Sequence, residues 1–199
     1  SVKNGGFPDY SKKPWKMGLF SGNNAASWRA SGKRWRDNAF SKLETIVTFA
    51  TDMGATAMYS DYVLPIAHHY ERHDFHLEPR TPFMQVIDKA VEPLGESVDD
   101  WTAYERLTKA ISLKAEERGI KPINDNVVGV PFARDFTKYH DDFTDEGEIK
   151  SVKDVIQFLL DNTTGIQNVK YEELAEKGFL RNKGSETTLH SKESPYFSE

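Results

Sequence analysis

Short apolar runs separated by polar turns mark the first third of the chain. Runs at Met17–Ser21, Ile46–Ala50 and Tyr62–Ile66 have the length and composition of buried strands. Between them lie a basic segment from Trp28 to Phe40, with the character of a helix, and a short helical turn from Ala55 to Tyr59. Strands that alternate with helices predict an α/β fold with three αβα layers around a mostly parallel sheet.

The pattern is less regular after the third strand. We expect a helix from Ala67 to His73, followed by a break from Asp74 to Pro82, where two prolines interrupt the chain. Alternating apolar residues then predict a strand from Met84 to Val91.

A long helix is predicted from Trp101 to Arg118, where apolar residues recur at spacings of three and four. Asp99 and Asp100 stand where an N-cap belongs, and Gly119 follows the last turn. These start and stop signals agree with the periodicity and bound the helix at both ends.

The chain changes character after Pro122. Asn124 to Gly147 is dense in Asp and aromatic residues without a period, so it predicts a loop. A capping box at Ser151–Asp154 and a glycine after Tyr171–Lys177 indicate two short helices. Since the apolar runs are concentrated in the first 120 residues, we place the core there and expect an irregular, partly helical C-terminal extension.

Composition narrows the classes of function. A net charge of -5 argues against general binding to nucleic acid or anionic membranes. The absence of cysteine excludes disulfides, iron–sulfur ligation and a thiol nucleophile within these 199 residues. No apolar run approaches the ~20 residues of a membrane span. The chain starts without Met or a signal sequence, and we expect both ends to be cuts in a longer protein.

Gly22-Asn23-Asn24 connects the first predicted strand to the helical segment behind it. Loops at this position hold phosphates on backbone N–H groups in many α/β proteins. Gly and Asn also favour an ordinary left-handed turn, so the loop alone leaves both interpretations open. No G-x-G-x-x-G or P-loop motif is present, which argues against ordinary dinucleotide or ATP binding.

A second polar cluster follows the strand that ends at Ala50. Thr51 and Asp52 come directly after it, and further polar residues surround the next strand. The carboxyl ends of parallel strands meet at one edge of a sheet, where α/β proteins build a ligand crevice. The sequence therefore predicts a crevice at this edge but not its occupant.

Four histidines lie close together, and His69 and His73 have the spacing of one helical turn. That spacing can bind zinc, and Glu71 or Asp74 could complete a site. The order is H-H-x-E-x-H rather than H-E-x-x-H, so the zinc-protease geometry fails. We favour packed or surface histidines and assign no metal ligand.

The basic segment gathers six cationic and aromatic residues: Trp28, Arg29, Lys33, Arg34, Trp35 and Arg36. We favour a solvated helix face. The alternatives are cationic support for a diphosphate or an acidic neighbouring surface, and stacking of nucleobases. Nucleic acid ranks last because the chain as a whole is acidic.

Asp99-Asp100-Trp101 has two interpretations. Asp is a favoured N-cap and suits the positive end of the helix dipole, so capping is favoured on the residues alone. A carboxylate at a cleft can also accept paired N–H donors from a guanine edge. No G-x-S-x-G motif is present and the carboxylates are too numerous to nominate an acid–base pair, so no catalytic residue is assigned.

Three segments, taken in order, resemble the molybdenum bis(molybdopterin guanine dinucleotide) oxidoreductases of the dimethyl sulfoxide reductase family. They are GLFSGNNAASW, T-A-x-x-S-D-x-V-L-P (Thr56–Pro65), and AVEP followed by DDW. RASGKRWRDN and the tail that begins EIKSVKDVIQFLLDN are similar to nitrate reductase and nitrite oxidoreductase catalytic subunits. Perchlorate, chlorate and selenate reductases, dimethyl sulfide dehydrogenase and ethylbenzene dehydrogenase share that subgroup.

The resemblance implies a set of cofactor-binding residues. Asp100 would bind the guanine edge, which reverses the preference for a simple cap. Five residues at two strand ends would lie beside the cofactor: Gly22, Asn23, Asn24, Thr51 and Asp52.

The resemblance also implies a division into domains. Residues 1–16 would be a linker, and residues 17–121 part of an αβα domain that binds one pterin guanine dinucleotide. Residues 122–199 would be an extension leading to a C-terminal cap domain outside this chain. The subgroup's aspartate ligand to molybdenum and its iron–sulfur segment lie earlier in the subunit. This chain would therefore supply walls of the cofactor site, without a catalytic residue or metal ligand of its own.

The implied parent enzyme is a prokaryotic oxyanion oxidoreductase acting on nitrate or nitrite, or on chlorate, perchlorate or selenate. Its partners would be the rest of the catalytic subunit, an iron–sulfur electron-transfer subunit and a membrane or haem subunit. It would work in a membrane-associated complex or the periplasm. The alternatives are a hydroxylating or sulfide dehydrogenase of the same subgroup, and a stand-alone nucleotide-binding or interaction module without redox activity.

Overall fold

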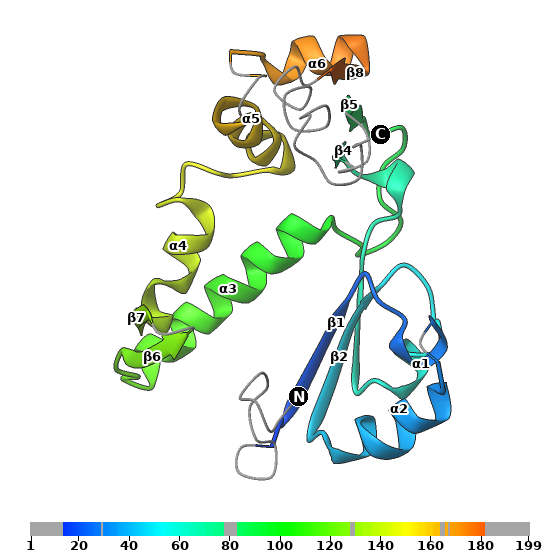
Figure 1. Cartoon of the computed structure of the whole chain (residues 1–199), viewed down its shortest axis with the longest axis vertical. Coiled ribbons are helices and arrows are strands. Elements are labelled where there is room, and N and C mark those ends of the chain that lie inside the picture. The colour runs from blue at the N-terminus through cyan, green and yellow to red at the C-terminus, as the bar shows by residue number, and fades with distance from the viewer. Residues whose placement is uncertain are drawn as a thin grey trace, which may run out of the picture. The chain divides into compact units, whose positions relative to one another are not determined.

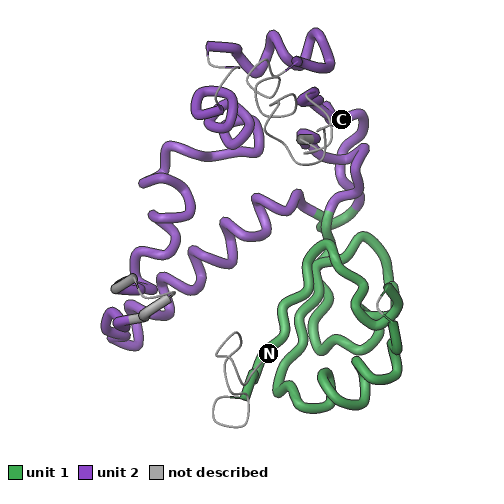
Figure 2. Tube along the Cα trace, viewed as in Figure 1, with its two compact units in different colours: residues 1–66, 95–97 green, residues 67–94, 98–199 purple. Residues whose placement is uncertain are grey.

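Two compact units make up the chain, residues 1–66 with 95–97 and residues 67–94 with 98–199 (Figure 2). The computed structural model describes residues 14–28, 30–77, 83–127, 130–163, 166 and 168–181. The division into units differs from the predicted domain boundaries after residues 16 and 121. Those boundaries concern a parent enzyme and stay a prediction.

The first unit contains a parallel sheet of three strands in the order β1-β2-β3 (Figure 1). Its strands are β1 (Met17–Ser21), β2 (Thr45–Ala50) and β3 (Tyr62–Pro65). Each lies within one residue of the strand that the apolar runs predict. The parallel sheet confirms the α/β class expected from the alternation of strands and helices.

Short helical segments connect these strands, and they differ from the single basic helix predicted over Trp28–Phe40. The structure has α1 (Ala25–Trp28) and α2 (Gly32–Asn38), with a break at Ser31, whose φ is 62°. A Cβ on Gly32 would come within 2.2 Å of the carbonyl oxygen of Ala26. The break therefore requires a glycine, which a count of helix-forming residues does not reveal.

One face of the parallel sheet packs against these helices. The cluster contains Ala25 and Ala26 of α1, Ile46 of β2, and Phe40 of the 3-10 turn η2 (Phe40–Lys42). The Phe20 ring meets that of Phe40 edge to face, with centroids 5.2 Å apart. A second 3-10 turn, η3 (Ala57–Tyr59), leads into β3, as the short helical turn predicted there suggests.

The start of the second unit differs from its predicted structure. The predicted helix from Ala67 to His73 is reduced to the single turn η4 (His69–Glu71), and β4 (Asp74–Leu77) occupies part of the predicted break. The backbone N–H of His68 donates to Glu71 Oε2 at 2.8 Å, which caps one turn. Arg72 then adopts an extended backbone, with φ -138°. The strand fits because the two prolines come after it.

An antiparallel sheet, in the order β4-β5-β8, follows from this strand. It contains β5 (Phe83–Ile87) and β8 (Phe179–Arg181). The predicted strand Met84–Val91 is therefore shorter and belongs to an antiparallel sheet of its own. The pairing of β5 with a strand so far along the chain has no local signal.

The long helix is α3 (Asp100–Glu117), close to its predicted bounds. The segment predicted as a loop instead contains a hairpin, β6 (Ile123–Val127) with β7 (Val130–Arg134), then η5 (Phe136–Lys138) and α4 (Tyr139–Thr144). Backbone pairing holds the hairpin together, so it needs no apolar periodicity.

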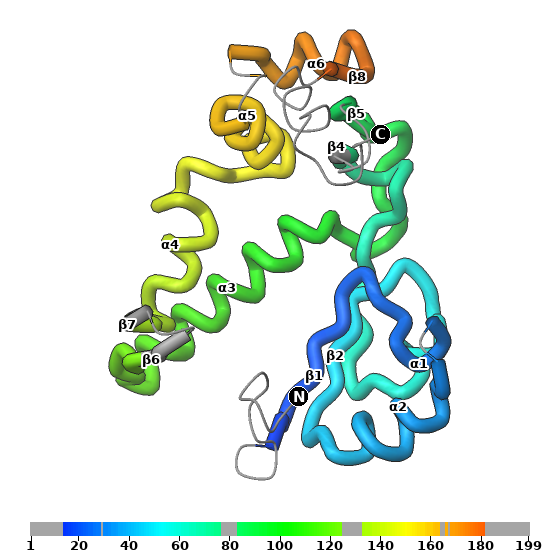
Figure 3. Tube along the Cα trace, viewed as in Figure 1, coloured from blue at the N-terminus to red at the C-terminus, as the bar shows by residue number. Residues whose placement is uncertain are grey.

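Two further helices follow in the second unit (Figure 3). Their caps agree with the predicted ones. α5 (Val152–Asn162) starts after Ser151, whose hydroxyl accepts from the Asp154 N–H, and α6 (Tyr171–Lys177) ends at Gly178, with φ 75°. Among the described residues, no helix is long and apolar enough to cross a membrane.

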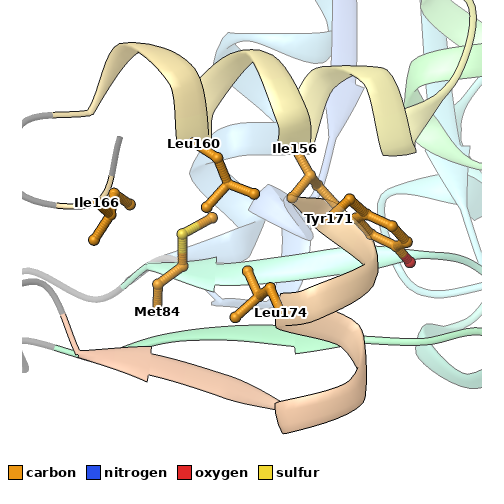
Figure 4. Close-up of a cluster of buried hydrophobic side chains, with 6 residues drawn as sticks. All are labelled: Met84, Ile156, Leu160, Ile166, Tyr171 and Leu174. Carbon is orange, nitrogen blue, oxygen red and sulfur yellow. The ribbon is translucent and has the colours of Figure 1, made fainter. Parts of the chain in front are cut away.

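Among the described residues, the larger of two clusters of buried apolar side chains is formed by these helices, the segment between them and β5 (Figure 4). Its members are Met84, Ile156, Leu160, Ile166, Tyr171 and Leu174. The expectation that the core lies in the first 120 residues is therefore wrong for this unit. An amphipathic helix buries only every third or fourth residue, so it forms a core without continuous apolar runs.

A cluster of hydrogen-bonded polar side chains connects α6 to the antiparallel sheet. The Tyr171 hydroxyl donates to Asp88 Oδ1 at 3.1 Å, and His73 Nδ1 lies 2.5 Å from the same oxygen. Burial, the negative charge of Asp88 and the hydrogen bond to it raise the pKa of Tyr171 to about 12. Burial alone would raise the pKa of Asp88, but hydrogen bonds from Tyr171 and His73 outweigh it and lower that pKa below its ordinary value.

Tyr171→Phe tests this cluster. We expect it to lower the free energy of unfolding by about 1 kcal/mol, because it removes one hydrogen bond to an exposed carboxylate. The raised pKa means that Tyr171 stabilises the fold below pH 10.0, and that this contribution is lost as the pH rises toward about 12. Urea unfolding of both proteins between pH 8 and 12 would measure this loss. The difference in unfolding free energy between the two proteins should shrink as the pH rises, and a difference that stays constant from pH 8 to 12 would contradict the assignment.

Candidate functional site

The carboxyl ends of the parallel strands meet at one edge of the first unit. Ser21 is paired with Phe49, and Ala50 with Pro65. The loop Gly22–Asn24 and the turn that begins Thr51-Asp52 therefore leave the sheet at the same edge. This is the arrangement that the sequence predicts for a ligand crevice.

A buried threonine is hydrogen-bonded to the first of these loops. Asn24 Oδ1 accepts two hydrogen bonds from Thr56, from its backbone N–H at 3.0 Å and from its hydroxyl at 2.8 Å. The same hydroxyl accepts from the backbone N–H of Ala26 at 3.1 Å. Thr56 is only 1% exposed. The loop is thus tied to the turn after β2 by one side chain that both donates and accepts.

Gly54 brings two predicted binding residues close together. A Cβ on Gly54 would lie 2.9 Å from Asn24 Nδ2 and 3.3 Å from Asp52 Oδ1. Both side chains therefore flank the same glycine, and a larger residue there would push them apart. Thr51 and Asp52 themselves are exposed.

The Gly22 loop has the left-handed turn that its composition allows, since the φ of Gly22 is 59°. Among the described residues, the backbone N–H groups of Asn23 and Asn24 meet no acceptor. Unpaired N–H groups beside a glycine at a strand end are the donors that a phosphate requires. The turn and the phosphate site are therefore compatible, and phosphate binding stays a prediction.

Other polar residues of this region hold the unit together instead of lining a crevice. The hydroxyls of Thr48 and Ser60 lie 2.6 Å apart, and Ser60 also donates to the carbonyl oxygen of Thr56 at 3.0 Å. Asp61 Oδ2 accepts from the backbone N–H of Ile46 at 2.7 Å. Several of the polar residues in this segment therefore form hydrogen bonds within the unit.

In the second unit the structure separates the roles of two adjacent aspartates. Asp99 is the N-cap of α3, with Oδ1 accepting from the Thr102 N–H at 2.7 Å and Oδ2 from the Thr102 hydroxyl at 2.9 Å. Asp100 is the first residue of the helix and makes an ion pair with Arg72, with Nη1 and Oδ2 2.5 Å apart. Capping of α3 therefore does not explain why an aspartate stands at position 100.

The histidines do not share a helix face, because the helix predicted for them is absent from the described residues 67–73. His69 Nδ1 lies 3.4 Å from Arg72 Nη2, whereas His73 belongs to the cluster with Asp88 and Tyr171. Within the described ranges, no three His, Asp or Glu side chains are grouped as a metal site requires.

The basic segment gathers no shared site in the described part of the chain. The Arg36 guanidinium lies over the Tyr59 ring, 5.4 Å from its centroid, and Trp28 is 71% exposed. Arg29 lies outside the described residues. The structure thus supports the solvated-face interpretation for Trp28, whereas Arg36 is partly buried against Tyr59.

An apolar pocket of about 750 Å³ lies elsewhere in the first unit. Residues 14–20 and 35–43 supply its lining, which includes the aromatic rings of Trp15, Phe20, Trp35 and Phe40. The lining follows β1 from Met17 to Phe20 and includes the segment that precedes β2. It contains none of the predicted cofactor-binding residues.

The family model described as molybdopterin oxidoreductase matches residues 9–110. This span covers half of the chain and contains every predicted cofactor-binding residue. The chain belongs to the molybdopterin oxidoreductase family. Membership implies a molybdopterin cofactor and confirms the family resemblance of the three sequence segments.

Relatives in this family include the alpha subunits of several enzymes. The alpha subunit of dimethylsulfide dehydrogenase from Rhodovulum sulfidophilum is 33% identical over 151 residues, 75% of this chain and 16% of that protein. The respiratory nitrate reductase alpha subunit of Haloferax mediterranei is 33% identical over 170 residues, 80% of this chain and 16% of that protein. The chlorate reductase alpha subunit of Ideonella dechloratans is 29% identical, covering 90% of this chain and 20% of that protein.

The chain thus spans a fifth or less of the length of these three relatives. A solved structure, acetylene hydratase from Pelobacter acetylenicus, matches with a TM-score of 0.54 and 18% identity. The match covers 87% of this chain and 19% of that chain. At this identity the likeness shows the fold alone.

Sequence reasoning missed three residues that organise this part of the molybdopterin oxidoreductase fold. Thr56 and Gly54 shape the edge at Asn24, and Arg72 holds Asp100. Thr56 was visible as part of a family motif, but nothing in the motif shows that its hydroxyl bonds to a loop 32 positions away. Arg72 stands among acidic and histidine residues, a pattern that usually indicates a solvated surface.

Proposed function

We propose that this chain forms walls of the site for one pterin guanine dinucleotide in the catalytic subunit of a molybdenum bis(molybdopterin guanine dinucleotide) oxidoreductase. The family match over residues 9–110 carries this proposal, because that span encloses both strand-edge loops and Asp100. Residues 17–121 would belong to the αβα domain that binds this cofactor half, and residues 122–199 would extend toward a cap domain.

The chain's own residues fit such a group at two places. At the sheet edge, the N–H groups of Asn23 and Asn24 would hold phosphate oxygens, while Thr56 and Gly54 keep the loop in shape. Thr51 and Asp52 would border the same group. In the second unit, Asp100 would accept hydrogen bonds from the guanine edge, since its side chain is 40% exposed and Asp99 already caps α3.

The cofactor, when bound, supplies oxygen-atom transfer and electron storage at molybdenum and its dithiolenes. The residues of this chain bind and orient it, and we assign them no catalytic step. The parent enzyme would act on an oxyanion, nitrate or nitrite first and chlorate, perchlorate or selenate next. A hydroxylating or sulfide dehydrogenase is the second candidate, favoured by the 33% identity to a dimethylsulfide dehydrogenase subunit.

The surface of the first unit supports a role within a larger subunit. The face of the sheet opposite the helices carries four exposed apolar side chains, Met17, Leu19, Tyr62 and Leu64, which are 41% to 62% exposed. An apolar face of this kind is usually covered in a native assembly. We infer that the rest of the catalytic subunit covers it. An iron–sulfur subunit and a membrane or haem subunit would complete a prokaryotic complex, membrane-associated or periplasmic.

Analysis of the protein encoded by the complete reading frame tests the proposal. We expect about one molybdenum and two guanine nucleotides per catalytic subunit, since each pterin carries one nucleotide, with reductase activity on nitrate or chlorate from a reduced viologen. A preparation that holds no molybdenum or guanine nucleotide would favour the stand-alone module without redox activity. Activity with dimethyl sulfide or a hydrocarbon, but with none of the oxyanions, would select the dehydrogenase alternative.

The 199-residue chain alone should retain no molybdenum and reduce no oxyanion, because it contains only part of the cofactor site. Metal analysis of the purified chain, with a viologen assay, measures both properties. Stoichiometric molybdenum in this chain would contradict the proposal that it supplies only walls of the site. The complete catalytic subunit, prepared in the same way, is the positive control.

A further inference from the structure

We propose that Arg72 is the positioning residue of the guanine site, because its guanidinium fixes the carboxylate of Asp100 that reads the purine. The inference rests on the proposed function, which assigns the guanine edge to Asp100. It adds the residue that sets the orientation of this carboxylate and makes the site selective for a 2-amino purine.

The geometry of Arg72 suits this role. Its Nη1 donates to Asp100 Oδ2 at 2.5 Å, and its Nη2 donates to Asp74 Oδ2 at 3.0 Å. The Arg72 side chain is 15% exposed, whereas that of Asp100 is 40% exposed. The buried member of the pair can therefore hold the accessible member in one orientation, and the accessible member can meet a ligand.

Arg72 is itself held by the start of the antiparallel sheet. Asp74, its second partner, accepts from the Phe75 N–H at 2.8 Å through its other oxygen. Arg72 Nη1 also lies 3.4 Å from the carbonyl oxygen of Ala67, and Arg72 Nε is buried without a partner among the described residues. The two outer nitrogens therefore carry the bonds, and they connect β4 to the first residue of α3.

The helix does not depend on Arg72 for its start. Asp99 caps α3 through two hydrogen bonds from Thr102, and neither involves Arg72. Removal of the guanidinium should thus remove the contact that orients Asp100 Oδ2, while α3 still begins at the same residue. This separation distinguishes a positioning role from a structural one.

The charges around Arg72 favour a ligand edge made of donors. One guanidinium lies within 3.0 Å of two carboxylates, so the three groups together carry a net negative charge. Guanine presents N1–H and the 2-amino group as adjacent donors, whereas hypoxanthine lacks the amino group and adenine presents an acceptor at N1. An arginine also reaches both carboxylates through its planar fork, which a lysine ammonium cannot do.

Nucleotide binding to the 199-residue chain tests the inference, with GMP, IMP and AMP as probes in NMR titrations. We expect the wild-type chain to bind GMP about tenfold tighter than IMP, the value of one hydrogen bond to a charged acceptor. Arg72→Gln should reduce this ratio to about one, and Arg72→Lys should restore part of it. Arg118→Gln, at the exposed end of α3, is the matched control and should keep the wild-type ratio.

Each outcome decides between the inference and the proposed function. If Asp100→Asn abolishes the preference for GMP but Arg72→Gln retains it, Arg72 is not a positioning residue and the guanine site stands. If Arg72→Gln weakens binding of all three nucleotides by the same factor, its role is structural and the inference fails. A wild-type chain without preference for GMP, or an Asp100→Asn chain that keeps it, would overturn the guanine assignment itself. Arg72→Lys, which keeps the charge, decides the question if Arg72→Gln does not fold.

Discussion

Leu160→Ala is expected to lower the free energy of unfolding of the second unit by about 2–5 kcal/mol, the usual range for a buried leucine. Leu160 is 0% exposed and lies in the cluster with Ile156, Met84 and Leu174 (Figure 4). Its truncation removes apolar contacts and leaves a cavity between α5 and the antiparallel sheet. Because these helices hold β8 against β5, the effect should extend to the whole sheet.

Hydrogen exchange of the α5 amide groups measures this loss, since three of the four tryptophans lie in the first unit and fluorescence would report mainly on that unit. Leu113→Ala is the matched control. It removes the same atoms from a helix, but Leu113 is 53% exposed, so we expect a change within about 0.5 kcal/mol. Equal losses from the two substitutions would show that the cluster around Leu160 is not a core.

The strands of the parallel sheet could be predicted because they are short, apolar and bounded by turns. Each of β1, β2 and β3 has its apolar residues within one short segment, so the signal that predicts it is local. The antiparallel sheet could not be predicted in the same way. The pairing of β5 with β8 is long-range, and Met84 reaches its partner Leu180 across nearly a hundred residues.

The candidate site could likewise be predicted only where its signal is local. Glycine and asparagine at a strand end predict a loop, and the parallel sheet places this loop beside Thr51 and Asp52. The contacts that give the site its shape are long-range, however. Arg72 meets Asp100 across 28 positions, and Asn24 meets Thr56 across 32. Such pairs leave no periodic pattern in the sequence, and only the fold brings their members together.

Thr56→Val is expected to destabilise the first unit by about 1–3 kcal/mol, because the substitution keeps the shape of a buried side chain but removes its hydroxyl. The Ala26 N–H would lose its acceptor, and Asn24 Oδ1 would lose one of its two donors. The Gly22 loop would then be held by the backbone N–H of Thr56 alone. We expect faster hydrogen exchange at Ala26 and, in the complete enzyme, weaker retention of the cofactor.

Two further variants separate the hydroxyl from the volume of the side chain. Thr56→Ser keeps the hydroxyl and should preserve the protection of the Ala26 amide, although it loses a buried methyl group. Thr108→Val removes a hydroxyl that is equally buried but bonds only to a carbonyl three residues earlier in α3, so its cost should be smaller. If Thr56→Val exchanges at Ala26 as slowly as wild type, the hydroxyl does not hold the loop. In that case the Asn24 loop owes its shape to Gly22 and Gly54, and Gly54→Ala, which forces Asn24 and Asp52 apart, becomes the variant with the larger effect.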